Sequence, residues 1–305
     1  MMELLQLKYF LKTAQAGSIT QAAKDLHIAQ PSLSKTIHRL EDQVGVRLFD
    51  RRGKHIYVNE AGQKFYQRVE TILHELDNAV QEARDTTCEA DKHLVLGTAT
   101  AKLLPETIRD YLMTHPDVHF RLLQVLDHQQ LWHKLQTGDI DLCISSLEPK
   151  EKDFCSFPLM TEKIYLVVSR RHPLAGRKAI SLEEVTDQPL IHYTAECGLR
   201  DIIEEGYRRI QRTPQFTCEC MTPEITCSLI EAGIGIGFLP ASLAHADYAR
   251  QLSWIAVTAP VMERTIWLSY NPAHYLSQAA VQFKDFVMEH FAPSGRQVTC
   301  QAENP

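Results

Sequence analysis

Two short helical patterns joined by a tight turn, between residues 18 and 44, restrict most strongly what this chain can fold into. Ser18 stands where it can cap the first helix, with Gln21 at the spacing of a capping box. After a turn, Pro31 occupies the stiff opening position of the second helix. The apolar residues that would face inward are Ala22, Ala23 and Leu26 in the first helix and Leu33, Ile37 and Leu40 in the second. Two short helices that cross at small residues are typical of a helix-turn-helix.

The segments on either side add a further helix and a hairpin. Before the helix pair, an apolar helical face ends near Gly17, where glycine can stop a helix; it consists of Leu4, Leu7, Phe10 and Leu11. After the pair, residues 46–58 read VRLFDRRGKHIYV and alternate around a glycine. This pattern predicts a β-hairpin wing with a basic tip. Such a wing contacts phosphates, whereas the second helix of a helix-turn-helix reads base edges.

The charge distribution separates the first sixty residues from the rest. The formal net charge of the chain is −6, which by itself disfavours a nucleic-acid partner. Residues 1–60, however, hold nine Lys and Arg against six Asp and Glu, a net +3, so the other 245 residues sum to −9. A basic module attached to an acidic body indicates that the module alone meets DNA.

Residues 7–62 resemble the winged helix-turn-helix of LysR-type transcriptional regulators. The resemblance rests on AGSITQAAKDL, QPSLSKTIHRLE, Gly45, LFDRRG and NEAG. It departs at Lys54, where arginine is common, and at Asn59, where threonine usually caps the next helix, but the charge and the capping oxygen are kept.

The resemblance implies a DNA-binding transcriptional regulator, an activator or a repressor, with double-stranded operator DNA as its partner and RNA polymerase as a further candidate partner. Thr20 and Arg52 would contact phosphates, and the start of the second helix would enter the major groove. The DNA-binding residues carried over from the family are Ser18, Thr20, Gln30, Pro31, Ser32, Ser34, Lys35, Arg39 and Arg52.

A long helix is expected to follow the wing. Its apolar residues recur at the a/d spacing of a coiled coil, at Phe65, Val69, Ile72, Leu76, Ala79 and Ala83. The pattern favours a two-chain coiled coil over a helix packed on its own domain. In the resembled family this helix dimerises the DNA-binding modules, so a homodimer or homotetramer is expected. RDTTCEAD, residues 84–91, would end the helix as a polar hinge.

From Leu94 onward, strand-like and helix-like patterns alternate in two series of similar length, 94–138 and 190–233. Such alternation predicts parallel sheets in an α/β arrangement, here as two similar lobes. KIYLVVSRRHPLA, from residue 163, would cross to the second lobe, and RTIWLSY, from residue 264, would return to the first. Two crossings leave a cleft between the lobes.

The predicted fold is therefore an N-terminal winged helix-turn-helix, a linker helix and a two-lobed α/β effector domain that resembles periplasmic binding proteins. The expected boundaries are 1–60 for the DNA-binding domain, 61–88 for the linker and 89–305 for the effector domain. Within the effector domain, lobe I takes about 89–163 and 265–305, and lobe II takes about 164–264.

Polar residues at the predicted strand ends suit an anion, because hydroxyls and free backbone N–H groups gather where helices start. Arg200 falls in the first turn of a lobe II helix and would add a charge-assisted pair. In the resembled family, equivalent positions bind small-molecule inducers, often carboxylates. The candidate effector-binding residues are Thr98, Thr100, Lys102, His128, Ser145, Thr194 and Arg200.

Three other functions remain as alternatives. A redox-sensing regulator would use Cys197, whose pKa a helix dipole could lower. A solute-binding protein would fit the lobes alone, and a zinc site would use Cys218, Cys220 and Cys227. The chain lacks GxSxG, HExxH, a P-loop and a strand-bound GxGxxG, so no enzyme, catalytic residue, metal or cofactor is expected.

No apolar run approaches 18 residues and the N-terminus lacks the pattern of a signal peptide, which predicts a cytoplasmic protein with no membrane partner. The eight cysteines lack a paired spacing, so reduced thiols are expected.

Overall fold

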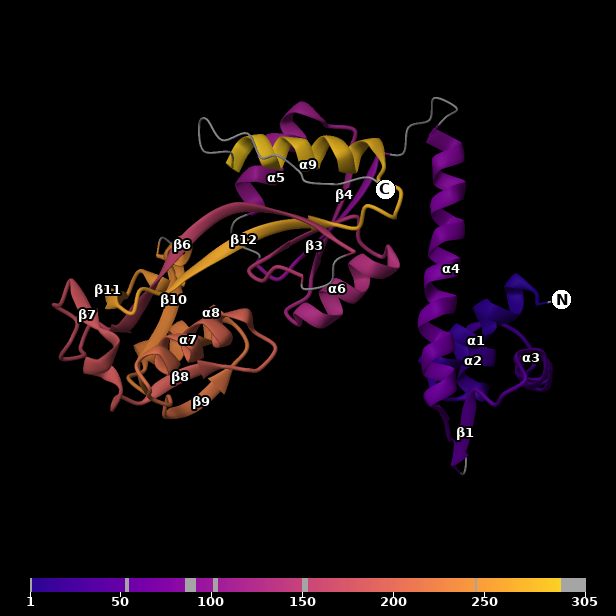
Figure 1. Ribbon diagram of the computed structural model, residues 1–305, viewed down its shortest axis with the longest axis horizontal. Helices are drawn as coiled ribbons and strands as arrows, with labels where there is room; N and C mark the ends of the chain where they lie inside the picture. Colours follow the sequence, from indigo (N-terminus) through magenta and orange to yellow (C-terminus); the bar gives the residue numbers. More distant parts are fainter. Residues whose placement is uncertain are drawn as a thin grey trace. The chain divides into compact units, whose positions relative to one another are not determined.

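The computed structural model describes residues 2–52, 55–85, 92–100, 104–149, 153–244 and 246–291 (Figure 1). The chain divides into two compact units, which consist of residues 1–80 and 81–305. Within the described residues, no helix is long and apolar enough to cross a membrane.

The first unit is a three-helix module with a hairpin and the start of a long helix. Its elements are α1 (Leu4–Ala16), α2 (Ile19–Asp25), α3 (Gln30–Val44), β1 (Phe49–Arg52), β2 (His55–Val58) and α4 (Glu60–Asp85). β1 and β2 pair antiparallel, with Phe49 opposite Val58. The helix-turn-helix and the wing strands predicted from the sequence are confirmed, while the wing tip at 53–54 lies outside the described residues.

Aromatic and aliphatic side chains hold this unit together. Phe10, Leu33, Leu40 and Leu48 are fully buried in one cluster. α4 begins close against the chain that enters the wing, because a Cβ on Gly62 would lie only 2.0 Å from the carbonyl oxygen of Leu48. The glycine therefore fixes the approach of α4 to the winged module.

The second unit consists of two α/β lobes joined by two long strands. Its helices are α5 (Leu104–Thr114), α6 (His128–Thr137), α7 (Gly198–Arg209), α8 (Pro223–Glu231) and α9 (Gln278–Phe291), with short 3-10 turns at 182–185, 241–243 and 247–249. Its strands are β3 (His93–Thr98), β4 (His119–Gln124), β5 (Leu142–Ser145), β6 (Cys155–Ser169), β7 (Ala179–Ser181), β8 (Leu190–Tyr193), β9 (Phe216–Cys220), β10 (Gly237–Pro240), β11 (Leu252–Ala259) and β12 (Glu263–Tyr270).

β6 and β12 run side by side from one lobe to the other (Figure 1). In lobe I, β4, β3 and β5 are parallel, and β12 joins them antiparallel to β5. In lobe II, β10 and β11 pair antiparallel with β6, and β8 pairs parallel with β9. The two-lobed α/β fold is as the sequence predicts, except that the crossing strands are antiparallel members of the sheet.

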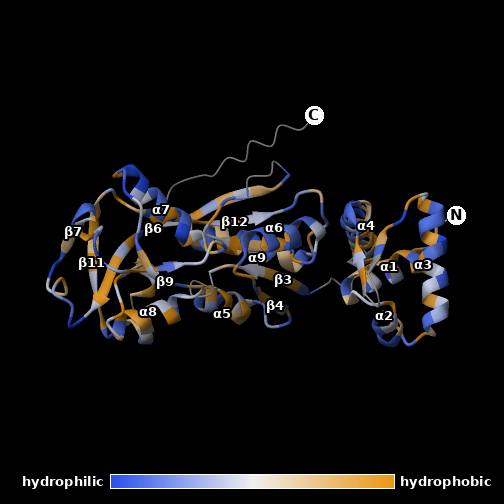
Figure 2. Cartoon of the chain, turned by 90° about the horizontal axis from the view of Figure 1, so that it is seen from below, coloured by the Kyte–Doolittle hydropathy of each residue, from blue (hydrophilic) through white to orange (hydrophobic). Residues whose placement is uncertain are grey.

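Each lobe has a core of its own. The lobe I core packs Leu96, Leu142 and Phe283 between the sheet and α9, and the lobe II core packs Leu166, Ile203 and Phe238. The helices that cover the sheet are amphipathic, and Figure 2 shows both hydrophobic and hydrophilic residues along α5, α8 and α9. The lobes therefore fold around separate cores.

Candidate functional site

The N-terminal turns of α3 present polar side chains to solvent. Gln30, Pro31, Ser32 and Lys35 are exposed, and Ser34 is half-buried. The opposite face is buried in the module's core through Leu33, Ile37 and Leu40. The apolar face thus fixes the helix on its module and leaves its polar start free for a partner.

α2 and the far end of α3 carry the other predicted DNA contacts. The Ser18 hydroxyl accepts from the Gln21 amide at 3.3 Å, but the Gln21 side chain donates to Asp25 instead, so the predicted capping box is only half formed. Thr20 is exposed. Arg39 is exposed and lies 3.4 Å from the Glu3 carboxylate. Arg52 ends strand β1 at the wing.

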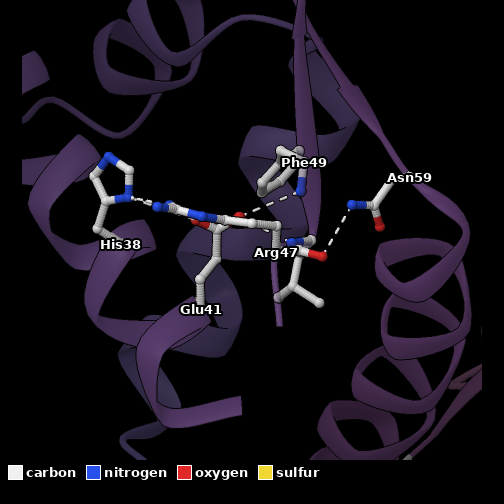
Figure 3. Close-up of polar contacts among 6 residues, drawn as sticks. His38, Glu41, Arg47, Phe49 and Asn59 are labelled. Carbon is white, nitrogen blue, oxygen red and sulfur yellow. Dashed lines mark hydrogen bonds and ion pairs between the residues drawn. The ribbon is translucent and has the colours of Figure 1, made fainter. Parts of the chain in front are cut away.

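A buried carboxylate joins α3 to the wing (Figure 3). Glu41 accepts from the backbone amides of Leu48 and Phe49 and from the guanidinium of Arg47 at 2.8 Å. Burial disfavours its charged form, but these hydrogen bonds outweigh that effect and lower the pKa of Glu41. Asn59 donates to the Arg47 carbonyl and accepts from the Gly62 amide, so it caps α4 as predicted.

The apolar residues of α4 differ in burial along the helix. Val69 is buried in the core of the winged module, and Phe65 and Leu73 pack against it. Ile72, Leu76 and Val80 are instead 54%, 43% and 43% exposed. The first part of the helix therefore belongs to its own domain, which corrects the expectation of a continuous seam from Phe65, and an apolar strip begins only at Ile72.

A pocket lies between the two lobes, lined by strand ends and helix starts. Lobe I supplies Thr100, Gln124, His128 and Ser146, lobe II supplies Cys197, Gly198, Thr222 and Ser242, and β12 supplies Arg264. α7 starts close against lobe I here, because a Cβ on Gly198 would lie 3.1 Å from both His128 and Ser146. Glycine at this position therefore lets the lobes approach.

Two buried hydroxyls of this pocket have no hydrogen-bond partner among the described residues. They are those of Thr100 and Ser242. An unpaired buried polar group costs about 1–3 kcal/mol. A bound molecule with matching donors and acceptors would recover that free energy.

Arg264 brings a buried positive charge to the pocket. Its Nε and Nη2 both lie 2.7 Å from Oε1 of Glu162, the residue opposite it on β6. The other Glu162 oxygen accepts from the Ser242 amide at 2.7 Å. This pair links the two crossing strands to the loop that carries Ser242.

Several predicted effector residues have other roles. The buried Thr98 hydroxyl donates to the Ile144 carbonyl and accepts from the Thr100 amide, and the Ser145 hydroxyl donates to the Leu147 carbonyl. Their hydroxyls thus hold strand ends together. Thr194 has an unpartnered buried hydroxyl but is not among the residues that line the interlobe pocket. Lys102 lies outside the described residues.

Arg200 also differs from its expected role. Its guanidinium donates to Glu204 at 2.7 Å, to Glu219 at 2.5 Å and to the Tyr193 carbonyl at 3.0 Å. It lies over the Phe216 ring, 5.9 Å from the centroid. These contacts hold it within lobe II, away from the pocket lining.

The cysteines do not support a redox sensor that relies on a lowered pKa of Cys197. Cys197 precedes α7, but burial raises the pKa of its thiol, and the N–H groups of the helix start only reduce that effect. Burial also raises the pKa of Cys220. Within the described ranges, no group of three His, Cys, Asp or Glu residues could hold a metal ion.

Ser242 and Arg264 are among the pocket residues that sequence reasoning missed, and both had signals. Ser242 is the second residue after β10, as Thr100 is after β3, so the strand-end rule that selected Thr100 would also select it. Arg264 alternates along β12 with the apolar residues Ile266 and Leu268, and a charge on such a face marks a buried pair.

Comparisons with known proteins cover both units. Residues 4–63 match the bacterial regulatory helix-turn-helix protein, lysR family, and residues 93–292 match the LysR substrate binding domain. The uncharacterized HTH-type transcriptional regulator YybE of Bacillus subtilis (strain 168) is 32% identical over 95% of this chain and 100% of its own length.

Two solved structures share the fold. The structure of CbnR, a LysR family transcriptional regulator, has a TM-score of 0.72 at 20% identity and covers 96% of this chain and 100% of that one. The effector-binding domain of QuiR in complex with shikimate has a TM-score of 0.60 at 26% identity and covers 65% of this chain and 96% of that one.

Proposed function

This chain belongs to the LysR family of transcriptional regulators, and we propose that a small anionic effector in the interlobe pocket controls how it binds its operator. The observation that carries this proposal is the pocket itself, where two unpartnered buried hydroxyls lie with a buried arginine. Hydroxyls, a guanidinium and a helix start are the groups that proteins use to bind carboxylates.

The proposed DNA contacts are those at the polar start of α3. Gln30 and Lys35 would meet base edges in the major groove, with Pro31, Ser32 and Ser34 allowing close approach. Ser18, Thr20, Arg39 and Arg52 would contact phosphates, which position the protein without reading sequence.

The proposed effector contacts are revised from those the sequence suggested. Thr100 and Ser242 would each bond an oxygen of the effector, and Arg264 would offer it charge through the Nη1 that Glu162 does not use. The QuiR domain binds shikimate, a hydroxylated carboxylate, in the same fold. We therefore propose a small carboxylate for this chain.

We also propose that the chain assembles as a homodimer or homotetramer through the apolar strip Ile72, Leu76 and Val80 on α4. Assembly joins two recognition helices, so their binding energies combine on two half-sites. Such a regulator would act in the cytoplasm, where a bacterial chromosome lies, and its role would be recognition without catalysis.

Calorimetry of the full-length protein against a panel of small carboxylates tests the effector proposal. Thr100→Val together with Ser242→Ala removes both hydroxyls at nearly constant volume, so binding of a carboxylate found with the unaltered protein should weaken at least about ten-fold. Ser228→Ala, an exposed serine on α8, is the matched control and should bind normally. Equal affinity in the double variant would place the effector elsewhere.

A further inference from the structure

A second pocket, here called the acidic pocket, opens beside the interlobe pocket and shares His128, Cys197 and Gly198 with it. Four carboxylates line it, at Asp127, Glu148, Glu196 and Asp201. No lysine or arginine is among the described residues that line it. The electrostatic potential of this pocket therefore favours a cation.

Two ring nitrogens in the lining have no hydrogen-bond partner among the described residues, Nε2 of His128 and Nε1 of Trp132. His128 is only 6% exposed, and its Nδ1 lies 3.4 Å from the Glu196 carbonyl oxygen. A carbonyl only accepts, so Nδ1 carries the proton and Nε2 presents a lone pair. Burial lowers the pKa of His128, which favours the neutral ring.

The walls are aromatic as well as acidic. Trp132 packs edge-on against the His128 ring, with 5.9 Å between the ring centroids, and Phe154 lines the same pocket. Aromatic faces attract ammonium and guanidinium groups, with indole the strongest. A bare metal ion fits less well, because no three of the described His, Cys, Asp or Glu side chains are grouped to hold one.

We propose that the acidic pocket is a second ligand site, which binds an organic cation bearing a protonated amine. The carboxylates supply its counter-charge, Nε2 of His128 accepts one of its N–H groups, and the Trp132 ring attracts its positive charge. The site goes beyond the anionic effector proposed above and does not depend on it. The two pockets share the wall formed by His128 and the start of α7.

Calorimetry of the full-length protein with 1,4-diaminobutane tests this proposal, with 1,4-butanediol as an uncharged probe of equal length. The diamine should bind in the presence of excess Mg²⁺, and the diol should not. Glu148→Gln with Asp201→Asn should weaken diamine binding about five-fold or more. Trp132→Phe, which replaces indole with a ring that attracts a cation less strongly, should also weaken it.

Glu183→Gln is the matched control, since Glu183 is an exposed carboxylate outside the pocket, and it should leave diamine binding unchanged. Thr100→Val with Ser242→Ala should also retain diamine binding, which separates failure of this proposal from failure of the anionic site. The proposal is overturned if the diamine binds no better than the diol, or if the carboxylate variants bind it as the unaltered protein does. Should the double carboxylate variant fail to fold, the comparison of diamine with diol on the unaltered protein decides.

Discussion

At the scale of single residues, Glu41 holds helix α3 to the wing through charge-assisted hydrogen bonds. Its pKa is lowered in the folded protein, so its contribution to stability is fully present above the pKa of an unfolded glutamate and disappears as the pH falls through the folded pKa. Glu41→Gln should therefore cost about 1.5–3 kcal/mol at pH 7.

Urea unfolding of the full-length protein and of Glu41→Gln between pH 7 and pH 3 measures this effect. The difference in the free energy of unfolding between the two proteins should shrink as the solution is acidified. A difference that stays constant over this range would show that the carboxylate charge at Glu41 does not stabilise the module.

Gln30 carries the second prediction at this scale. Its amide can donate to and accept from one base edge, so Gln30→Ala should cost about 1–3 kcal/mol at a single base pair and relax the preference there. Selection of sites from randomised duplex DNA measures the change, with Gln67→Ala, an exposed glutamine on α4, as control. An unaltered preference at every position would remove Gln30 from the recognition surface.

For Arg200 and Arg264, the sequence could not predict which groups the side chain contacts. The position of Arg200 in the first turn of α7 could be predicted from the helical pattern, but its partners could not. Glu204 lies one turn along the same helix and Glu219 lies on β9, and both form ion pairs with the Arg200 guanidinium. Arg264 faces the pocket because of the register between β12 and β6, which no local pattern specifies.

At the scale of elements, the exposed strip on α4 should decide assembly. Leu76→Lys places a charge where an apolar partner surface is proposed, and desolvating it there is unfavourable. Affinity for an operator with two half-sites should fall much more than affinity for one half-site. Gel-shift titrations on both DNAs, with Gln67→Lys as control, measure the two affinities, and an unchanged operator affinity would contradict the strip as the dimer surface.

Element positions followed closely from the sequence because local signals agreed with one another. Pro31 stands in the first turn of α3, and Asn59 caps α4. The burial of Val69 could not be predicted in this way, since its spacing fits both a coiled-coil seam and the core of the winged module. Only the packing of α4 against that module distinguishes the two.

At the scale of the whole molecule, the proposed coupling of a ligand to a change in shape rests on the two lobes of the second unit. Its lobes have separate cores, and the Glu162–Arg264 pair joins the crossing strands directly beside the pocket. A ligand shifts such an equilibrium only by the difference in its affinity for the two states. An effector that contacts both lobes would have that difference if its full set of contacts formed only with the lobes closed.

The footprint of the full-length protein on its operator, with and without an effector found by calorimetry, tests the central claim most directly. We expect the effector to change the length of operator DNA that the protein protects. Thr100→Val with Ser242→Ala should abolish that change and leave the DNA affinity without effector nearly intact. Ser228→Ala should respond as the unaltered protein does. A double variant that still responds at the usual effector concentration would contradict control through the interlobe pocket.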